Sequence, residues 1–354
     1  MPKPLLTAVL TGLVLLTSLC SKAAVKQDFT VCWTLYAGWM PWEYAAAQGV
    51  VDKWADKYGI RIKLTQVNDY VESINQYTAG QFDACTMTNM DALTIPAAGG
   101  VDSTALIVGD FSNGNDGVVI KGVGKTVADL KGMDVNLVEL SVSHYLLARA
   151  LDSVGLKERD LKVVNTSDAD IAAAFNTEQV QAVTTWNPML GEVNARPGVT
   201  QVFDSSDIPG EILDLMVVNT QTLNDNPALG KALTGAWYEV MALMAEQSPA
   251  TDAALAHMAK ASGTDLEGFK AQLSTTYLFA TPQATLAFVN GEALPRTMEK
   301  VAKFSFDHGL LGAGAQDSGA VGMRFAKGAG VGDQTNVKLR FDPAYVQMAV
   351  DGRL

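Results

Sequence analysis

The chain has 354 residues, of which 48% are hydrophobic and 18% are charged. This length and composition indicate more than one average domain and exclude an intrinsically disordered protein. The formal net charge of −12 argues against a nucleic-acid partner, because phosphate binding requires Lys and Arg. The net charge does not fix the charge of a small ligand, since one pocket need not share the sign of the whole surface.

Residues 1–24 have the pattern of a signal peptide. Lys3 supplies a positive start, and residues 5–19 form an apolar run too short to span a bilayer comfortably. Cys20 raises a lipoprotein as an alternative, but the bulky residue before it favours cleavage without lipidation. No later stretch is long and apolar enough to be a membrane span. We therefore expect an exported, periplasmic protein.

The next part of the chain, residues 25–112, alternates predicted strands with predicted helices. An apolar run at 29–35 predicts a buried strand, and Pro41 opens a helix that runs to about Tyr58. Asp69 and Glu72 form a capping box at the start of the next helix. Further strands are predicted at 60–65, 82–86 and 105–108. This alternation predicts a parallel sheet.

Two cysteines remain after the signal peptide, Cys32 and Cys85, and each lies in a predicted strand. An oxidising compartment would permit a disulfide, but side chains on adjacent parallel strands rarely have suitable geometry. We therefore predict two buried thiols. The three histidines, His144, His257 and His308, are far apart in the sequence, and no Cys/His cluster has metal-ligand spacing. Neither a metal nor another cofactor is predicted.

A cluster of turn-forming residues at 113–117 predicts a crossover into a second domain. In this domain the sequence predicts strands at 118–120, 133–138, 161–164 and 180–185, and a helix at 143–154. A strand at 212–218 leads back, and helices are predicted at 228–246, 252–260, 266–273, 282–289 and 295–307. We therefore expect lobe 1 to comprise residues 25–112 and 214–354, including an unassigned tail from 310. Residues 113–213 form lobe 2.

Motifs for catalysis are weak. Gly124-Lys125-Thr126 resembles the end of a phosphate-binding loop, but the glycine required five positions earlier is replaced by Val119. Ser143 and His144 are adjacent, so their side chains diverge on a helix and make a poor nucleophile–base pair. The sequence predicts no catalytic residues and no enzyme activity.

Acidic and aromatic residues collect at six predicted strand tips, 36–43, 68–72, 86–91, 138–145, 185–190 and 209–214. These stretches contain no Lys or Arg, and their acids are Glu43, Asp69, Glu72, Asp91, Glu139, Glu211 and Asp214. An anion site would normally present Arg or Lys, so the pattern favours a neutral or cationic ligand. For Asp69, Glu72 and Asp91, helix capping is an equally good explanation.

The first of these tips contains Tyr36, Trp39 and Trp42, and a later one contains Trp186. Flat aromatic faces at a strand tip suit a small planar or cationic ligand. The alternative is that they pack beneath the loop, which is as good an explanation for Trp42. In open α/β sheets, ligands bind beyond the carboxyl ends of the strands, which is where these residues are expected.

The order and spacing of several segments resemble the periplasmic solute-binding proteins of ABC importers, in the nitrate/sulfonate/taurine branch, which is also related to thiamine-pyrimidine binding proteins. The resemblance covers about residues 29–300 and is carried by Gly80-Gln81-Phe82-Asp83-Ala84, Ser141-Val142-Ser143-His144-Tyr145-Leu146-Leu147 and Val180-Gln181-Ala182-Val183-Thr184-Thr185-Trp186-Asn187-Pro188. Within that branch, Trp39-Met40-Pro41-Trp42, Asn68-Asp69-Tyr70-Val71-Glu72-Ser73-Ile74 and Met87-Thr88-Asn89-Met90-Asp91-Ala92-Leu93 are most similar to the urea-carboxylase-associated proteins, which implies guanidine or urea as ligand.

The resemblance implies a two-lobed α/β periplasmic binding protein, type II-like, with the ligand in a cleft between two Rossmann-like domains and captured by hinge closure. It also implies a monomer that docks on an ABC permease in the inner membrane. The expected ligand-binding residues are Tyr36, Trp39, Asp69, Asn89, Asp91, Glu139, His144, Trp186 and Asp214. Alternatives are a binder of taurine, alkanesulfonate, nitrate or a thiamine precursor, a thiamine-pyrimidine-synthase-like enzyme, and a sensor subunit.

Overall fold

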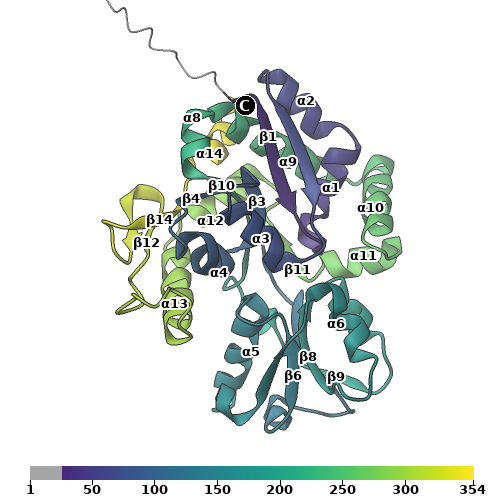
Figure 1. Ribbon diagram of the computed structural model, residues 1–354. Helices are drawn as coiled ribbons and strands as arrows, with labels where there is room; N and C mark the ends of the chain where they lie inside the picture. The colour runs from purple at the N-terminus through teal and green to yellow at the C-terminus, as the bar shows by residue number, and fades with distance from the viewer. Residues whose placement is uncertain (1–25) are drawn as a thin grey trace, which may run out of the picture.

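The computed structural model describes residues 26–354, which fold into two α/β lobes (Figure 1). The predicted signal peptide, residues 1–24, lies outside the described residues. We call the body around the nine-stranded sheet the large lobe and the body around the five-stranded sheet the small lobe. Two connections, residues 113–115 and 205–212, join them, so the chain leaves the large lobe once and returns once. The predicted fold class is confirmed.

The large sheet has the strand order β13-β12-β14-β4-β10-β3-β1-β2, with β11 paired to β4. Its strands include β1 (Asp28–Trp33), β3 (Ala84–Thr88), β4 (Ser103–Ser112), β10 (Leu213–Asn219) and the edge strand β2 (Arg61–Gln66). Strand β1 pairs in parallel with β2 and β3, as predicted. The sheet is nevertheless mixed, because β10 is antiparallel to both β3 and β4. Strand β10 returns from the small lobe and enters the sheet at the end where β3 and β4 finish. It therefore runs antiparallel to both.

The single helix predicted from Pro41 to Tyr58 is in fact two, α1 (Met40–Ala47) and α2 (Val50–Lys57). Gly49, between them, has a φ of 71°. Glycine adopts this left-handed conformation at little cost, and the helix cannot continue through it. The next helices on this lobe are α3 (Tyr70–Thr78) and α4 (Asn89–Ala92), and a π-helical turn, η2 (Leu93–Ala97), accommodates Pro96.

The small sheet has the order β7-β6-β8-β5-β9. Its strands are β5 (Asp116–Lys121), β6 (Asp134–Leu137), β7 (Lys162–Asn165), β8 (Ala182–Trp186) and β9 (Val199–Asp204), and its main helices are α5 (Val142–Ser153), α6 (Asp168–Phe175) and α7 (Met189–Asn194). Strand β5 is antiparallel to β8 and β9, whereas β6 is parallel to β7 and β8. The strand β9 and the helices α6 and α7 were not predicted, because their sequences are weakly patterned.

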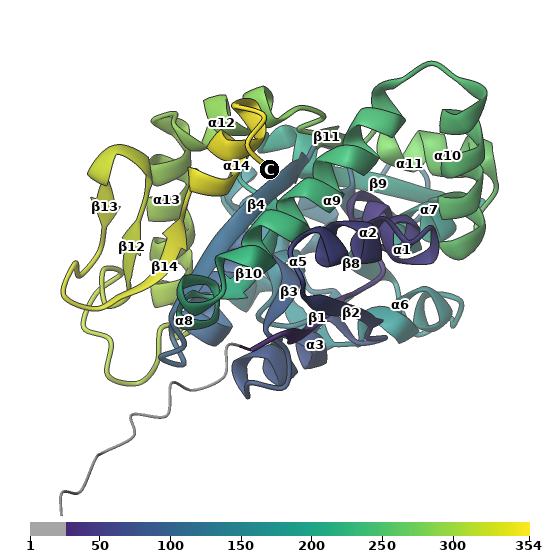
Figure 2. The ribbon, with the colours of Figure 1, turned by 90° about the horizontal axis from the view of Figure 1, so that it is seen from above.

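The chain after β10 begins with α8 (Thr220–Asp225), which was not predicted. It is then mostly helical, as predicted, with α9 (Pro227–Ala245), α10 (Pro249–Ala261), α11 (Leu266–Leu273), α12 (Pro282–Val289), α13 (Ala293–Asp307) and the short strand β11 (Thr276–Leu278). The unassigned tail extends the large sheet (Figure 2). It forms β12 (Gly322–Arg324), β13 (Gly330–Val331), β14 (Val337–Phe341) and α14 (Ala344–Val350), and β14 pairs in parallel with β4.

Cys32 and Cys85 form a disulfide, so the prediction of two buried thiols was wrong. The two residues are register partners on the neighbouring strands β1 and β3. Their Cα atoms are 4.4 Å apart, at the short end of the range that a disulfide spans. The register, which places the cysteines directly opposite each other, is the information that the sequence lacked.

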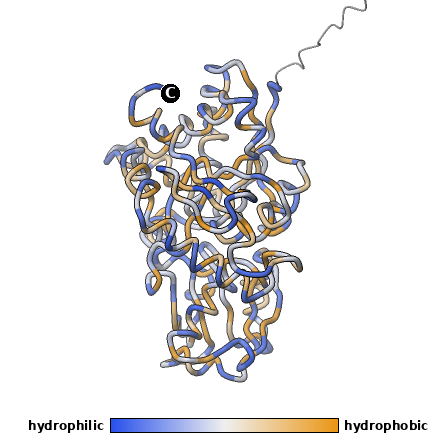
Figure 3. The backbone as a smooth tube through the Cα atoms, turned by 90° about the vertical axis from the view of Figure 1, so that its left-hand side faces the viewer, coloured by the Kyte–Doolittle hydropathy of each residue, from blue (hydrophilic) through white to orange (hydrophobic). Residues whose placement is uncertain are grey.

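Apolar residues follow the strands through the interior of both lobes, and polar residues cover the outer turns (Figure 3). Strand β3 is buried at every position, as expected for a central strand with helices on both faces. Within residues 26–354, no helix is long and apolar enough to cross a membrane.

Candidate functional site

The candidate site lies where the two lobes meet. On the large-lobe side, β1, β3 and β4 end at this edge and β10 begins there. The lobes are in contact: the Ala37 N–H donates to the Asn187 carbonyl over 3.3 Å, and the Tyr70 N–H donates to the Asp168 carboxylate over 3.2 Å. The structure therefore shows a closed arrangement of the lobes.

Four aromatic rings and two carboxyl groups enclose a small cavity at this junction. We call Tyr36, Trp39, Tyr70, Trp186, Asp116 and Asp214 the aromatic–acid cage; Thr88, Val142 and Ile212 complete its lining. Ring centroids lie 5.1 Å apart for Tyr36 and Trp39, 6.0 Å for Trp39 and Tyr70, and 5.5 Å for Tyr70 and Trp186. The cavity has a volume of about 10 Å³, which is room for about one water molecule. A ligand of few heavy atoms would have to move the side chains that line it.

Both lobes supply the rings. Tyr36 precedes a short 3-10 turn, η1 (Ala37–Trp39), and Trp39 ends it, shortly after β1. The Trp186 ring, at the end of β8 in the small lobe, is fixed by its indole N–H, which donates to the Leu35 carbonyl over 3.3 Å. Gly38 is required at this turn because a Cβ there would lie 2.4 Å from the Tyr36 ring. The cage is therefore complete only when the lobes are together.

The two acids of the cage and a third acid behind it, Asp110, come from three strands. Asp214 in β10 and Asp110 in β4 are register partners, and Asp116 opens β5 in the other lobe. All three are 3% exposed or less. Asp110 lies behind the cavity wall, where it accepts a hydrogen bond from the Tyr36 hydroxyl over 2.9 Å. Asp116 accepts one from the Ser112 hydroxyl.

Among residues 26–354, no basic side chain lines the cage beside its two acids, Asp116 and Asp214. None of the residues lining the cage is Lys, Arg or His. One oxygen on each of Asp214, Asp110 and Asp91 is buried without a hydrogen-bond partner. A buried ionised carboxylate is unfavourable unless it is paired, so each group here either holds a proton or needs a cation.

The pKa values reflect this environment. Burial raises the pKa of Asp116 to about 7 and that of Asp91 to about 6. Burial also raises the pKa of Asp110 to about 7, and burial together with the negative charge of Asp110 raises the pKa of Asp214 well above its usual range. The ligand-free cage therefore holds protons near neutral pH. A bound cation would favour the ionised forms and displace those protons.

The structure brings together four of the nine residues expected at the site: Tyr36, Trp39, Trp186 and Asp214 line the cavity. A fifth, Asp91, lies one layer behind it. Its carboxylate accepts hydrogen bonds from the Tyr70 hydroxyl over 2.6 Å and the Thr88 hydroxyl over 2.8 Å. Asp91 thus holds the Tyr70 ring in the wall.

The other expected acids and the amide lie outside the cavity lining. Asp69 caps α3 by accepting the Glu72 N–H, as the alternative interpretation held, and it also accepts a hydrogen bond from Ser167 of the small lobe. Asn89 ties α4 to the returning chain through the Glu211 carbonyl and the Leu213 N–H. Glu139 is exposed.

His144 also lies outside the cage. Its ring is buried on α5 beside Glu158 and His308, and its Nε2 is 3.3 Å from a Glu158 carboxylate oxygen. Within residues 26–354, these three side chains are the group whose ligand atoms lie close enough together to hold a metal ion. This cluster was not predicted, because its members are far apart in the chain.

Tyr70, Asp110 and Asp116 were not among the predicted site residues. Asp110 carried the same signal as Asp214, an acid within an apolar strand, and could have been found in that way. Asp116 was interpreted only as a turn former. Conversely, Glu211 was counted among the tip acids, but its carboxylate is neutralised by Arg149 at 2.9 Å and Lys300 at 2.6 Å.

Comparison with known proteins gives a consistent fold assignment. A family model described as NMT1/THI5 like matches residues 53–251. The chain is similar to the crystal structure of the periplasmic aliphatic sulphonate binding protein from Escherichia coli, with a TM-score of 0.67, 21% identity, and coverage of 82% of this chain and 95% of the other. At this level of identity, the similarity establishes the fold.

Among curated proteins, the chain is 31% identical over 168 residues to the "Putative aliphatic sulfonates-binding protein" of Escherichia coli (strain K12), covering 48% of this chain and 50% of that protein. It is also 31% identical over 117 residues to a "Putative binding protein" of Brucella abortus (strain 2308), covering 33% of this chain and 36% of that one. The chain thus matches half or less of the length of these relatives.

Proposed function

The chain belongs to the NMT1/THI5-like family, and on that premise we propose that it is the periplasmic substrate-binding protein of an ABC importer and that it captures guanidinium. The observation that carries the proposal is the aromatic–acid cage: buried carboxyl groups without a basic partner, between aromatic faces, at the junction of two lobes. In this proposal the protein releases its ligand unchanged to a membrane permease.

Guanidinium is a flat cation and suits the cage in charge and in the flat faces of its aromatic rings, which would have to move apart to admit it. Its plane can lie against the faces of Trp39 or Trp186, where a cation is attracted by the ring electrons. Its N–H groups can donate to Asp214 and Asp116, and hydrogen bonds between charged groups are about twice as strong as neutral ones. Each lobe supplies one of these acids and at least one ring, so the ligand would favour the closed arrangement by binding both lobes.

Urea has nearly the same shape but is neutral and carries an acceptor oxygen. An ionised carboxylate cannot donate to that oxygen. We therefore expect guanidinium to bind about 1.5–3 kcal/mol more tightly, which is on the order of tenfold to a hundredfold in affinity. A protonated carboxyl could donate to urea, so the preference should be strongest where the acids are ionised.

An alkanesulfonate is the second candidate, favoured by the names of the relatives in Escherichia coli. The cage offers such an anion no Lys or Arg and would place it beside Asp116 and Asp214. The charge of the cage thus supports the cation over the anion.

Isothermal titration calorimetry with guanidinium, urea, taurine and nitrate tests the proposal. Guanidinium should bind most tightly, and Asp214→Asn should reduce the difference between guanidinium and urea. Asp134→Asn, at an exposed position on the small lobe, should leave both affinities unchanged. Equal affinities for urea and guanidinium, or tight binding of taurine, would refute the proposal.

A further inference from the structure

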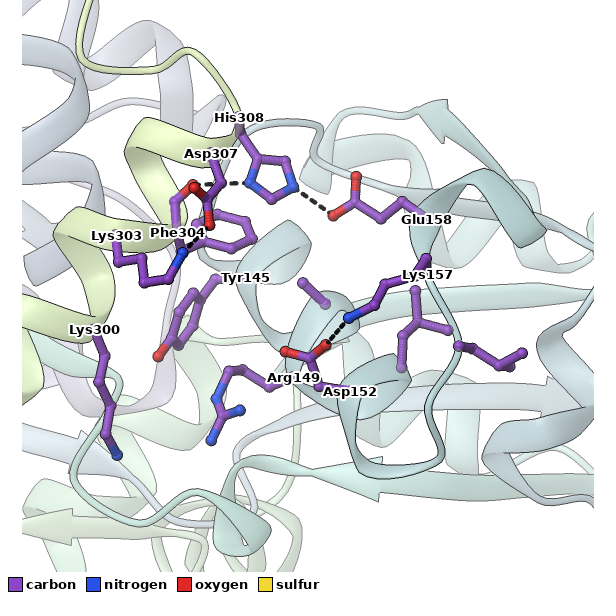
Figure 4. A pocket seen from close by; sticks show the side chains of 13 residues that line it. Tyr145, Arg149, Asp152, Lys157, Glu158, Lys300, Lys303, Phe304, Asp307 and His308 are labelled. Atoms are coloured by element: carbon purple, nitrogen blue, oxygen red, sulfur yellow. Dashed lines mark hydrogen bonds and ion pairs between the residues drawn. The ribbon is translucent and has the colours of Figure 1, made fainter. Parts of the chain in front are cut away.

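A second group of ionisable residues, outside the cage, joins the lobes. His308 directly follows α13, and Glu158 begins the small-lobe turn η4 (Glu158–Asp160). The His308 Nε2 lies 2.6 Å from a Glu158 carboxylate oxygen, across a groove between α13 and α5 (Figure 4). His308 is 22% exposed and Glu158 is 29% exposed, so both can exchange protons with solvent.

The hydrogen bonds of His308 determine its protonation state. The Phe304 carbonyl, 2.8 Å from Nδ1, can only accept a hydrogen bond, so Nδ1 carries a hydrogen. The ionised Glu158 carboxylate beside Nε2 is also only an acceptor, so Nε2 carries a hydrogen as well. Both contacts can be satisfied together only by the imidazolium form. The hydrogen bond to Glu158 raises the pKa of His308, and His308 together with His144 lowers the pKa of Glu158 to about 2.

His144 cannot act in the same way, and it argues against a metal at this cluster. Its Nδ1 accepts the Leu140 N–H over 3.1 Å, so in the neutral ring the hydrogen lies on Nε2. The Nε2 atom that faces Glu158 therefore lacks the free electron pair that a metal ion requires. His144 instead lies within the small lobe with its Nε2 3.3 Å from a Glu158 carboxylate oxygen.

We propose that His308 is a proton-dependent latch between the lobes, which holds the closed arrangement when its imidazolium is paired with Glu158. Opening the lobes would return His308 to solvent, where histidine titrates near pH 6.5. The latch is complete below that pH and is lost as the pH rises through the higher pKa of the closed form. Each unit of difference between the two pKa values changes the ratio of closed to open molecules tenfold.

Other charges around His308 are already paired. Lys303 binds Asp307, Lys157 binds Asp152, and Glu211 binds Arg149 and Lys300. The cage acids also titrate near neutral pH. Their ionisation as the pH rises would likewise favour the open form of the ligand-free protein. The contribution of the latch is therefore the part of the pH-dependent change in the closed fraction that is lost when His308 is replaced.

The test measures the distance between the lobes in the ligand-free protein by pulsed electron spin resonance, with spin labels on Val123→Cys and Asp52→Cys, both at exposed positions. The closed fraction should fall between pH 6 and pH 8.5, and His308→Gln should reduce that fall. His257→Gln is the matched control, because His257 pairs with Glu43 over 3.0 Å entirely within the large lobe. Its pH response should equal that of the parent.

A response in His308→Gln as large as in the parent would refute the latch. Glu158→Gln provides a second route if His308→Gln does not fold, and it should also weaken the response. The latch would also be refuted if added zinc closed the lobes of the parent protein but not those of His308→Gln, because the cluster would then be a metal site. The latch rests on the two-lobed closure of the proposed function and not on the ligand, and its measurement contains none. Failure of guanidinium to bind would therefore leave it intact.

Discussion

Guanidinium affinity should rise with pH, and Asp116 allows the size of the effect to be worked out. The carboxyl group of Asp116 lines the cage and is 3% exposed, and burial raises its pKa to about 7. About a tenth of the molecules carry the ionised form at pH 6 and about nine tenths at pH 8. A guanidinium group stays charged throughout this range. If the cation requires the ionised carboxylate, the apparent affinity scales with that fraction and should rise about tenfold between pH 6 and pH 8.

Asp116→Asn removes this titration. The variant should bind guanidinium more weakly at pH 8, by on the order of tenfold to a hundredfold, and its affinity should change less with pH. Titration calorimetry at both pH values, in buffers of different ionisation enthalpy, measures the affinity and the protons released. Asp134→Asn is the surface control and should keep the dependence of the parent. An affinity that is unchanged or falls as the pH rises would refute the argument that a cation displaces protons from the cage.

Three further outcomes follow from the same geometry. The ligand-free protein should lose thermal stability from pH 5 to pH 8 in a thermal-shift assay, because buried acids with raised pKa values must ionise in the folded state; a rise over this range would contradict that account. Gly38→Ala should weaken guanidinium binding and lower stability by about 1–3 kcal/mol, because its Cβ would overlap the Tyr36 ring, and an unchanged affinity would show that the ring is free to move. Replacing both Cys32 and Cys85 by Ala should cost about 4 kcal/mol in chemical denaturation, from the chain entropy of a 53-residue separation, while binding in the folded protein persists; loss of binding without loss of stability would contradict a purely structural role.

The sequence by itself determined the architecture and part of the composition of the candidate site. Hydrophobic periodicity and capping signals are local properties of the chain, so most of the strands and nearly all the helices after Asn226 were predicted close to their observed bounds. The absence of Lys and Arg from the strand tips was also visible in the sequence, and four predicted residues, Tyr36, Trp39, Trp186 and Asp214, line the cage.

Only the tertiary structure decided which acids meet and which are already neutralised. Strand register places Asp110 opposite Asp214 and Cys32 opposite Cys85, and register depends on contacts between residues distant in the chain. Packing between the lobes brings His308 to Glu158, and packing also neutralises Glu211 with Arg149. Local sequence pattern carries the identity of each residue and its preferred element, but burial and charge pairing arise only when the sheets and lobes come together.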